Sequence, residues 1–220
     1  MGHLRRGCYN TNLRPDIVNL IITGLRQRDL LKDKLEGRLT RAAVTVSMMR
    51  IIKIAVRKTS WPLHHKRLMW AVAADSFNGS FRTHELLSRC PMEFDPTSTL
   101  MRQDVKLGQC KAEGTTTAVL KVHLKSPKEQ RLKDGITVEL FATNSFLCPV
   151  TAFNNYVRDC PFNLADDKPV FRTMDGKGYT GKMFNADLKI LLHGHVDYKD
   201  GKITSHSFRA GLATESGVTI

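Results

Sequence analysis

The sequence lacks a CxxC pair, a long apolar run and an N-terminal apolar segment. Its five cysteines are scattered and odd in number, which argues against a disulfide framework and against a zinc ribbon. No apolar run approaches the roughly 18–20 residues that a membrane span needs. The first ten residues, MGHLRRGCYN, carry no apolar segment after their arginines, so we expect no secretory signal. We interpret the thiols as reduced and intracellular, in a chain whose 220 residues fit one medium domain, or one domain plus a remnant of another.

Positive charge is plentiful and uneven. Residues 1–70 hold 15 basic and 4 acidic side chains, a net charge of +11, whereas the remaining 150 residues hold 19 and 17, a net of +2. This asymmetry favours a polyanionic partner that contacts mainly the N-terminal third. Nucleic acid and anionic membrane are the two candidate polyanions, and a basic soluble surface without a partner is the third interpretation.

Apolar spacing predicts helices in the first half of the chain. One helix follows Pro15, and residues 26–43 are rich in mixed charge, so we expect a linker or exposed helix and a domain boundary there. A second helix is expected to begin near Thr45, which is a plausible N-cap. A third is expected to begin near Ser60, to be buried all round and to stop at Gly79, followed by another in FRTHELLSR.

Between about residues 100 and 143 the apolar period changes to two. Leu120, Val122 and Leu124 alternate with polar residues, and a second run does the same around Val138, so we expect an antiparallel hairpin with a long basic tip. Helices are then expected from Pro149, around residues 184–192 and from Ser205, with a short strand at 169–172. The predicted fold class is α+β, mainly helical, with a small antiparallel sheet.

The segment ITSHSFRAGLAT places His206 and Arg209 three residues apart, on one face of a helix and in its first turns. Backbone N–H groups at a helix N-terminus also favour an anion, so the three kinds of donor together predict a phosphate site. The motif by itself is weak, since a capped helix with a solvated arginine would show the same spacing.

A second motif, FNGSFRTHELLS, places Arg82 after a glycine break and Glu85 three residues later. A carboxylate at this spacing holds the guanidinium by a charged hydrogen bond and prepares it to grip a phosphate through two N–H groups. The alternative is an ordinary surface pair that contributes only a few tenths of a kcal/mol.

A third group of basic residues lies in the hairpin tip, LKSPKEQRLKDG, which contains Lys125, Lys128 and Arg131. One of its lysines is a candidate donor of a proton to a departing oxygen. The alternative is a loop that only touches the DNA backbone. In the basic N-terminal third of the chain, we expect Lys53, Arg57 and Lys58 to contact DNA phosphates.

The three motifs, in this order, resemble those of the tyrosine recombinase (phage integrase) superfamily, and most nearly its eukaryotic DIRS-type and crypton-type elements. GSFRTHELL resembles the family's first arginine motif, with one extra residue between Gly79 and Arg82. KSPKEQRLKDGITVEL resembles the hairpin that carries the family's lysine, for which Lys128 is our match and Lys125 the alternate. HSFRAG resembles the H-x-x-R box. The resemblance covers residues 41–217, and it implies a catalytic domain over 37–220 preceded, in 1–36, by the remnant of a helical DNA-binding domain.

The resemblance implies strand exchange on double-stranded DNA without a metal or other cofactor. Arg82 and Arg209 would neutralise the scissile phosphate, Lys128 would protonate the leaving 5′ oxygen, and His206 would assist proton transfer. A tyrosine would attack phosphorus and form a covalent 3′ linkage. Only 11 residues follow Arg209 and none is tyrosine, tryptophan or histidine. We therefore expect a domain without the nucleophile-bearing C-terminus and without the covalent intermediate.

Two other functions remain alternatives. The first is a non-catalytic DNA-binding module derived from a recombinase. The second is an RNA-binding or general interaction protein, for which no RNP-like strand pattern or KH-type loop is visible. The resemblance further implies homo-oligomers on DNA and, in a eukaryotic cell, a nuclear location. Histidine pairs such as His64 and His65 are interpreted as surface or core residues, since no carboxylate or cysteine cluster accompanies them.

Overall fold

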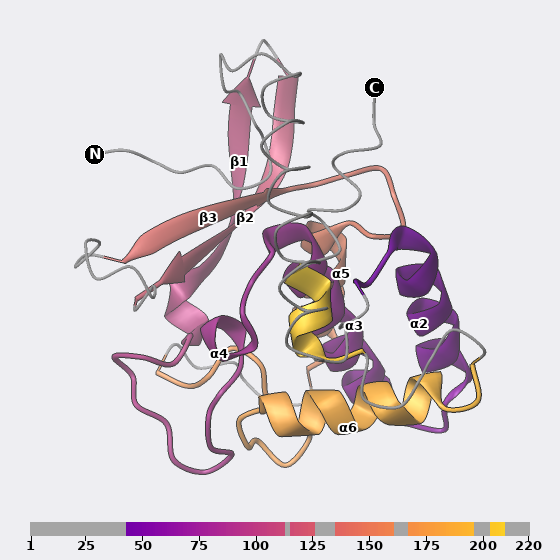
Figure 1. Cartoon of the computed structure of the whole chain (residues 1–220). Coiled ribbons are helices and arrows are strands. Elements are labelled where there is room, and N and C mark those ends of the chain that lie inside the picture. Colours follow the sequence, from indigo (N-terminus) through magenta and orange to yellow (C-terminus); the bar gives the residue numbers. More distant parts are fainter. Residues whose placement is uncertain (1–42, 113–114, 126–134, 161–166, 196–202, 210–220) are drawn as a thin grey trace, which may run out of the picture.

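A computed structural model describes residues 43–112, 115–125, 135–160, 167–195 and 203–209. Its helices and strands are α2 (Val46–Lys58), α3 (Leu63–Gly79), α4 (Thr83–Leu86), the 3₁₀ turn η1 (Arg102–Asp104), β1 (Val105–Ala112), β2 (Thr115–Leu124), β3 (Ile136–Phe141), α5 (Pro149–Arg158) and α6 (Gly181–Leu192). Residues 205–209 are also helical. The helices gather on one side and the sheet on the other, with α6 running transverse to α2 and α3 (Figure 1). The predicted mainly helical α+β class is confirmed, while the predicted remnant in 1–36 and the boundary in 26–43 lie outside the described residues.

Helices α2 and α3 form the centre of the helical layer. The expected N-cap Thr45 accepts a hydrogen bond from the backbone N–H of Met48, and one face of α2 is buried. Every residue of α3 from 68 to 77 is buried. A helix that is apolar nearly all round can be stable only inside a protein, and α3 accordingly packs against α2, α5 and the sheet.

Helix α3 ends at Gly79, but the residue whose backbone adopts the left-handed conformation is the next one, Ser80. Ser80 takes φ 50°, a conformation more usual for glycine. Gly79 is needed for a different reason, because a Cβ there would lie 2.2 Å from the ring of Phe81. The buried Phe81 ring therefore closes over the helix end, and the chain turns at once into α4. The helix expected in FRTHELLSR is only the single turn α4, because the chain then runs extended at Leu87.

The sheet is antiparallel in the order β1-β2-β3. The expected hairpin is confirmed, with Leu120 opposite Leu140 and Val122 opposite Val138. These inward-facing residues are buried where the sheet packs against α3 and α5. The tip, residues 126–134, lies outside the described residues. The sequence did not predict β1, which lies at the edge opposite β3 in the described sheet.

Helices α5 and α6 complete the layer and agree with the expected apolar spacing. Phe153 and Tyr156 of α5 are fully buried against α3, and Phe184 and Leu188 of α6 are fully buried as well. The strand expected at 169–172 is wrong: this segment makes only isolated bridges, one of them between Met101 and Pro169. Within the described residues, no helix has both the length and the apolar character needed to cross a membrane.

Candidate functional site

Arg82 stands at the N-cap of α4 and is held there by Glu85. The Glu85 carboxylate accepts one hydrogen bond from the backbone N–H of Arg82 at 2.7 Å and another from its Nη1 at 3.0 Å. The Glu85 side chain is 4% exposed, whereas that of Arg82 is 27% exposed. A buried carboxylate thus fixes both the main chain and the guanidinium, and the remaining N–H donors of Arg82 bond no described residue. The ion pair expected from the sequence is present.

Lys125 lies beside this pair, at the point where β2 leaves the sheet. Its ammonium group pairs with Asp104 at 2.6 Å and donates to the carbonyl oxygen of Pro96 at 2.8 Å. Lys125 and Glu85 line the same small crevice, together with His84 and other residues of the α4 region. The base of the basic hairpin therefore lies next to Glu85, the residue that holds Arg82. Lys128 and Arg131, the other hairpin candidates, lie outside the described residues.

The helical segment 205–209 carries the other two candidates. His206 is exposed and Arg209 is half-buried. The segment is anchored on α6, because the Phe208 ring packs on that of Phe184 with centroids 5.4 Å apart. The Asn185 side-chain carbonyl also accepts a hydrogen bond from the backbone N–H of Ser205 at 2.9 Å.

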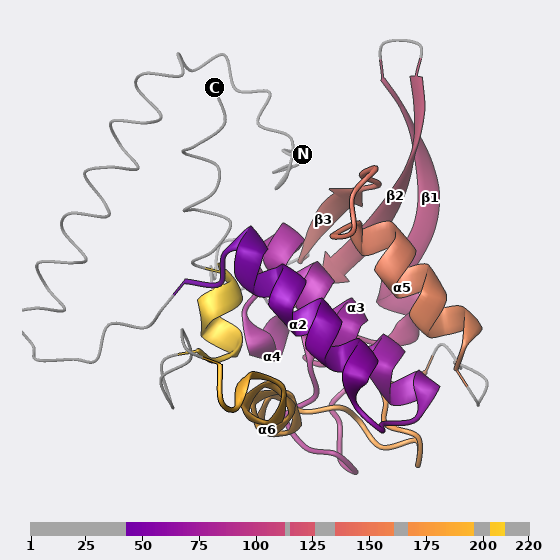
Figure 2. The same cartoon turned by 90° about the vertical axis from the view of Figure 1, so that its right-hand side faces the viewer.

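The first turn of α6 brings the two arginine-bearing segments to one end of the domain. Thr83, the first residue of α4, lies against Gly181, where a Cβ would be 2.6 Å from the Thr83 methyl group. Asn185, which holds the 205–209 segment, is four residues further along α6, or about 6 Å of helix. Figures 1 and 2 both show α4 and the 205–209 segment near one another. Arg82 and Arg209 thus belong to neighbouring segments, and Lys125 adjoins the first of them.

The three basic residues of α2 lie elsewhere. Lys53 is half-buried, donates to the Phe146 carbonyl oxygen at 2.9 Å and stands 4.9 Å from the centre of the Trp70 ring. Its pKa is lowered, first by burial and then by the positive charges of Arg57 and Arg67. Arg57 and Lys58 are exposed. None of these three residues lines the crevice of Glu85 and Lys125.

A solved structure of low sequence identity shares this arrangement of elements. FLP recombinase in a complex with a Holliday junction matches with a TM-score of 0.50 and 15% identity, over 95% of this chain and 49% of that one. XerH, a site-specific recombinase bound to its difH substrate in a pre-cleavage complex, matches with a TM-score of 0.49 and 12% identity, over 80% of this chain and 43% of that one.

The fold is that of a tyrosine-recombinase catalytic domain. The chain spans about half of the length of these solved recombinases or less. No protein-family model matches the chain, and no curated protein matches its sequence.

Both described tyrosines of this recombinase-like domain are in its core. Tyr156 and Tyr179 are 0% exposed. The Tyr156 hydroxyl donates to the Val170 carbonyl oxygen at 3.0 Å, and the Tyr179 hydroxyl donates to Asp187 at 2.5 Å. The pKa values of both phenols are raised, mainly by burial. Neither phenol is therefore accessible at the surface of the domain.

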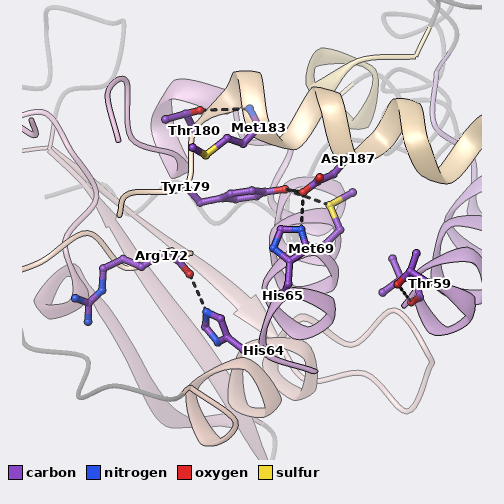
Figure 3. A network of polar contacts seen from close by, with 10 residues as sticks. Thr59, His64, His65, Met69, Arg172, Tyr179, Thr180, Met183 and Asp187 are labelled. Atoms are coloured by element: carbon purple, nitrogen blue, oxygen red, sulfur yellow. Dashed lines mark hydrogen bonds and ion pairs between the residues drawn. The ribbon is translucent and has the colours of Figure 1, made fainter. Parts of the chain in front are cut away.

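Tyr179 belongs to a polar network that the sequence did not predict (Figure 3). Asp187 of α6 accepts from Tyr179 and also contacts Nε2 of His65 in α3, at 2.9 Å. The neighbouring His64 contacts the Arg172 carbonyl oxygen at 2.9 Å. The network fastens α6, which supports both arginine segments, to the central helix. Side chains 122 positions apart meet here, and no periodicity in the sequence signals such a contact.

Proposed function

We propose that this domain binds double-stranded DNA and holds one backbone phosphate between Arg82 and Arg209, as the phosphate-binding part of a DNA recombination or integration enzyme. One observation carries the proposal: the guanidinium of Arg82 is fixed by a buried carboxylate and the Arg209 segment is anchored on the same end of α6. An arginine that is already oriented loses little entropy on gripping a phosphate through two N–H groups.

The chemistry that this site would serve is phosphoryl transfer. Arg82 and Arg209 would neutralise the non-bridging oxygens as the phosphate becomes crowded in the transition state. A proton from Lys128, or from Lys125 as the alternate, would go to the leaving 5′ oxygen, and His206 would assist proton transfer. The bond formed is between a tyrosine oxygen and phosphorus, and the bond broken is between phosphorus and the 5′ oxygen.

We further propose that the chain on its own does not form the covalent intermediate. Support comes from the burial of Tyr156 and Tyr179, whose hydroxyls are both engaged inside the core. The same burial favours the second candidate function, a non-catalytic DNA-binding module derived from a recombinase. A DIRS-type or crypton-type mobile element, nuclear in a eukaryotic cell and oligomeric on DNA, is the source that the sequence motifs favour.

A double-mutant cycle tests whether both arginines hold the same phosphate. We expect Arg82→Ala and Arg209→Ala each to weaken duplex binding by about tenfold or more, since a charged hydrogen bond contributes roughly 1.5–3 kcal/mol. Groups that share one partner are not independent, so the double variant should lose less than the product of the two single effects. Lys177→Ala removes an exposed lysine that pairs with Asp175, and it serves as the control. Independent, multiplicative effects would reject a shared phosphate.

Denaturing gel electrophoresis after incubation with nicked duplexes tests the proposed inactivity of the chain. We expect no protein–DNA adduct, as for a binding module. An adduct would contradict the proposed inactivity. The substitution Tyr198→Phe would then be the first to make, because Tyr198 lies outside the described residues, whereas both described phenols are buried.

A further inference from the structure

The helices α2, α3 and α5 face the viewer in Figure 2. A second cavity is lined by residues of these three helices. Its volume is about 400 Å³, and the segment that joins β3 to α5 forms part of its wall through Ser145 and Phe146. It shares no lining residue with the crevice of Glu85 and Lys125. This α2–α3–α5 pocket is therefore separate from the candidate phosphate site.

Four cationic side chains line the α2–α3–α5 pocket and no carboxylate does. Arg67 is neutralised by Asp159, with Nε and Oδ2 2.9 Å apart. Lys53, Arg57 and Lys66 form no ion pair with any described acidic residue. Positive charge is thus crowded around a hollow, and the lowered pKa of Lys53, caused by burial and then by its two arginine neighbours, reflects that crowding. A bound anion would relieve the repulsion.

Part of the wall between these cations is apolar. Val56 and Trp70 are buried, while Leu63, which also lines the pocket, is 58% exposed. The Trp70 ring stacks with Phe146 at an interplanar angle of 22°. A small inorganic anion would leave this wall in contact with water, so the lining suits an anion that carries an apolar, planar body.

We propose that the α2–α3–α5 pocket binds a nucleotide, with its phosphate among Lys53, Arg57 and Lys66 and its base against Leu63 and Val56. The volume fits one small organic ligand, since such pockets span roughly 300–1,000 Å³. Arginine and lysine together suit a phosphate, which accepts both a planar fork and a point charge. The nucleotide is either free or the unpaired last nucleotide of a DNA strand, because both present the same phosphate and base.

Calorimetry on the unaltered chain tests the ligand class. The probes are deoxyadenosine monophosphate, inorganic phosphate and deoxyadenosine. We expect saturable binding of the nucleotide, with each of the other two probes weaker by about tenfold or more, as the loss of one charged contact or of one apolar contact surface implies. Equal binding of deoxyadenosine, equal binding of inorganic phosphate, or no saturable heat with the nucleotide would overturn the proposal.

A matched pair of substitutions tests the location. Arg57→Gln should weaken nucleotide binding by about tenfold, whereas Lys177→Gln, which removes the same charge from an exposed turn, should not. Trp70 lines the pocket and Trp61 does not, so quenching of tryptophan emission in a Trp61→Phe variant reports the same event without altering the cations. Equal effects of the two substitutions, or saturation without any change in Trp70 emission, would place the ligand elsewhere.

Single-stranded oligonucleotides with and without a 5′ phosphate distinguish the two sources. Displacement of the nucleotide by the phosphorylated strand alone assigns the pocket to a strand end, and failure of both strands to displace it assigns the pocket to a free nucleotide. Displacement by both strands equally would contradict recognition of a terminal phosphate. The test uses no duplex, so nucleotide binding would stand even if the arginine variants of the proposed DNA site had no effect on duplex affinity.

Discussion

Asp75 is a carboxyl group inside the central helix α3, where its residue is 1% exposed. Its Oδ1 accepts no hydrogen bond from a described residue. Burial raises its pKa well above the usual 3.8, and the nearby Cys148 thiol adds to the effect. The native protein therefore keeps this group protonated at pH values where the unfolded chain has already lost the proton.

The sign of the pH dependence follows. Above about pH 4 the unfolded chain releases the proton and the native protein does not, so the free energy of unfolding falls as pH rises, up to the native pKa. For one proton the slope is at most about 1.4 kcal/mol per pH unit. Asparagine is neutral at every pH and similar in size, so the free energy of unfolding of Asp75→Asn should fall less steeply with pH above about pH 4. Urea unfolding at pH 5, 6, 7 and 8 measures it.

The control for Asp75 is Asp167→Asn, which alters an exposed carboxylate. That variant should keep the slope of the unaltered chain. If Asp75→Asn and the unaltered chain lose the same stability between pH 5 and pH 8, the buried carboxyl is not the source of the dependence.

At the scale of elements, α4 and the first turn of α6 are in close contact within the candidate site. Gly181→Ala would place a methyl group 2.6 Å from the Thr83 side-chain methyl, closer than side chains pack. Overpacking of this kind costs roughly 1–3 kcal/mol, against which alanine's better helix propensity recovers up to about 1 kcal/mol. We expect a lower free energy of unfolding and weaker duplex binding, because α4 carries Arg82.

Thr83→Ser provides the rescue, since it removes the methyl group that the new Cβ would meet and keeps the hydroxyl. The double variant should recover most of the stability and of the duplex affinity lost in Gly181→Ala, as thermal unfolding and binding titrations would measure. Recovery of stability without recovery of binding would show that the α4–α6 contact does not position Arg82.

The elements that the sequence predicted are those with a regular burial pattern, either one-sided or buried all round. Leu120, Val122 and Leu124 alternate because only one face of β2 meets the helices, and α3 is apolar because it is surrounded. Strand β1 was missed because its sequence lacks a regular apolar alternation, with Gly108 interrupting it and Leu107 left 44% exposed. The sequence predicted the Arg82–Glu85 pair because it is local, with a spacing of three.

Contacts between distant segments were not predictable in this way. Lys125 pairs with Asp104, and His65 meets Asp187, through side chains brought together only by packing of whole elements. The α2–α3–α5 pocket is of the same kind, because three helices and a connecting segment contribute to it. Local periodicity determines which face of an element is buried, and the neighbour of that face is determined by the topology of the whole domain.

For the molecule as a whole, the excess of positive charge makes the salt dependence of duplex affinity the most direct measure of how DNA is held. Each phosphate that the protein neutralises lowers the logarithm of the duplex binding constant by about 0.9 per unit of log salt concentration. If Arg82 and Arg209 grip one phosphate together, the double variant Arg82→Ala, Arg209→Ala should reduce the magnitude of that slope by about 0.9. Two separately held phosphates would reduce it by about 1.8.

Fluorescence titrations of labelled duplex from 50 to 300 mM salt would measure the slopes, with Lys177→Ala as the control that keeps the slope of the unaltered chain. A slope unchanged by the double variant would mean that DNA is held by other basic residues, and the pairing of the two arginines at the end of α6 would then serve only the stability of the domain.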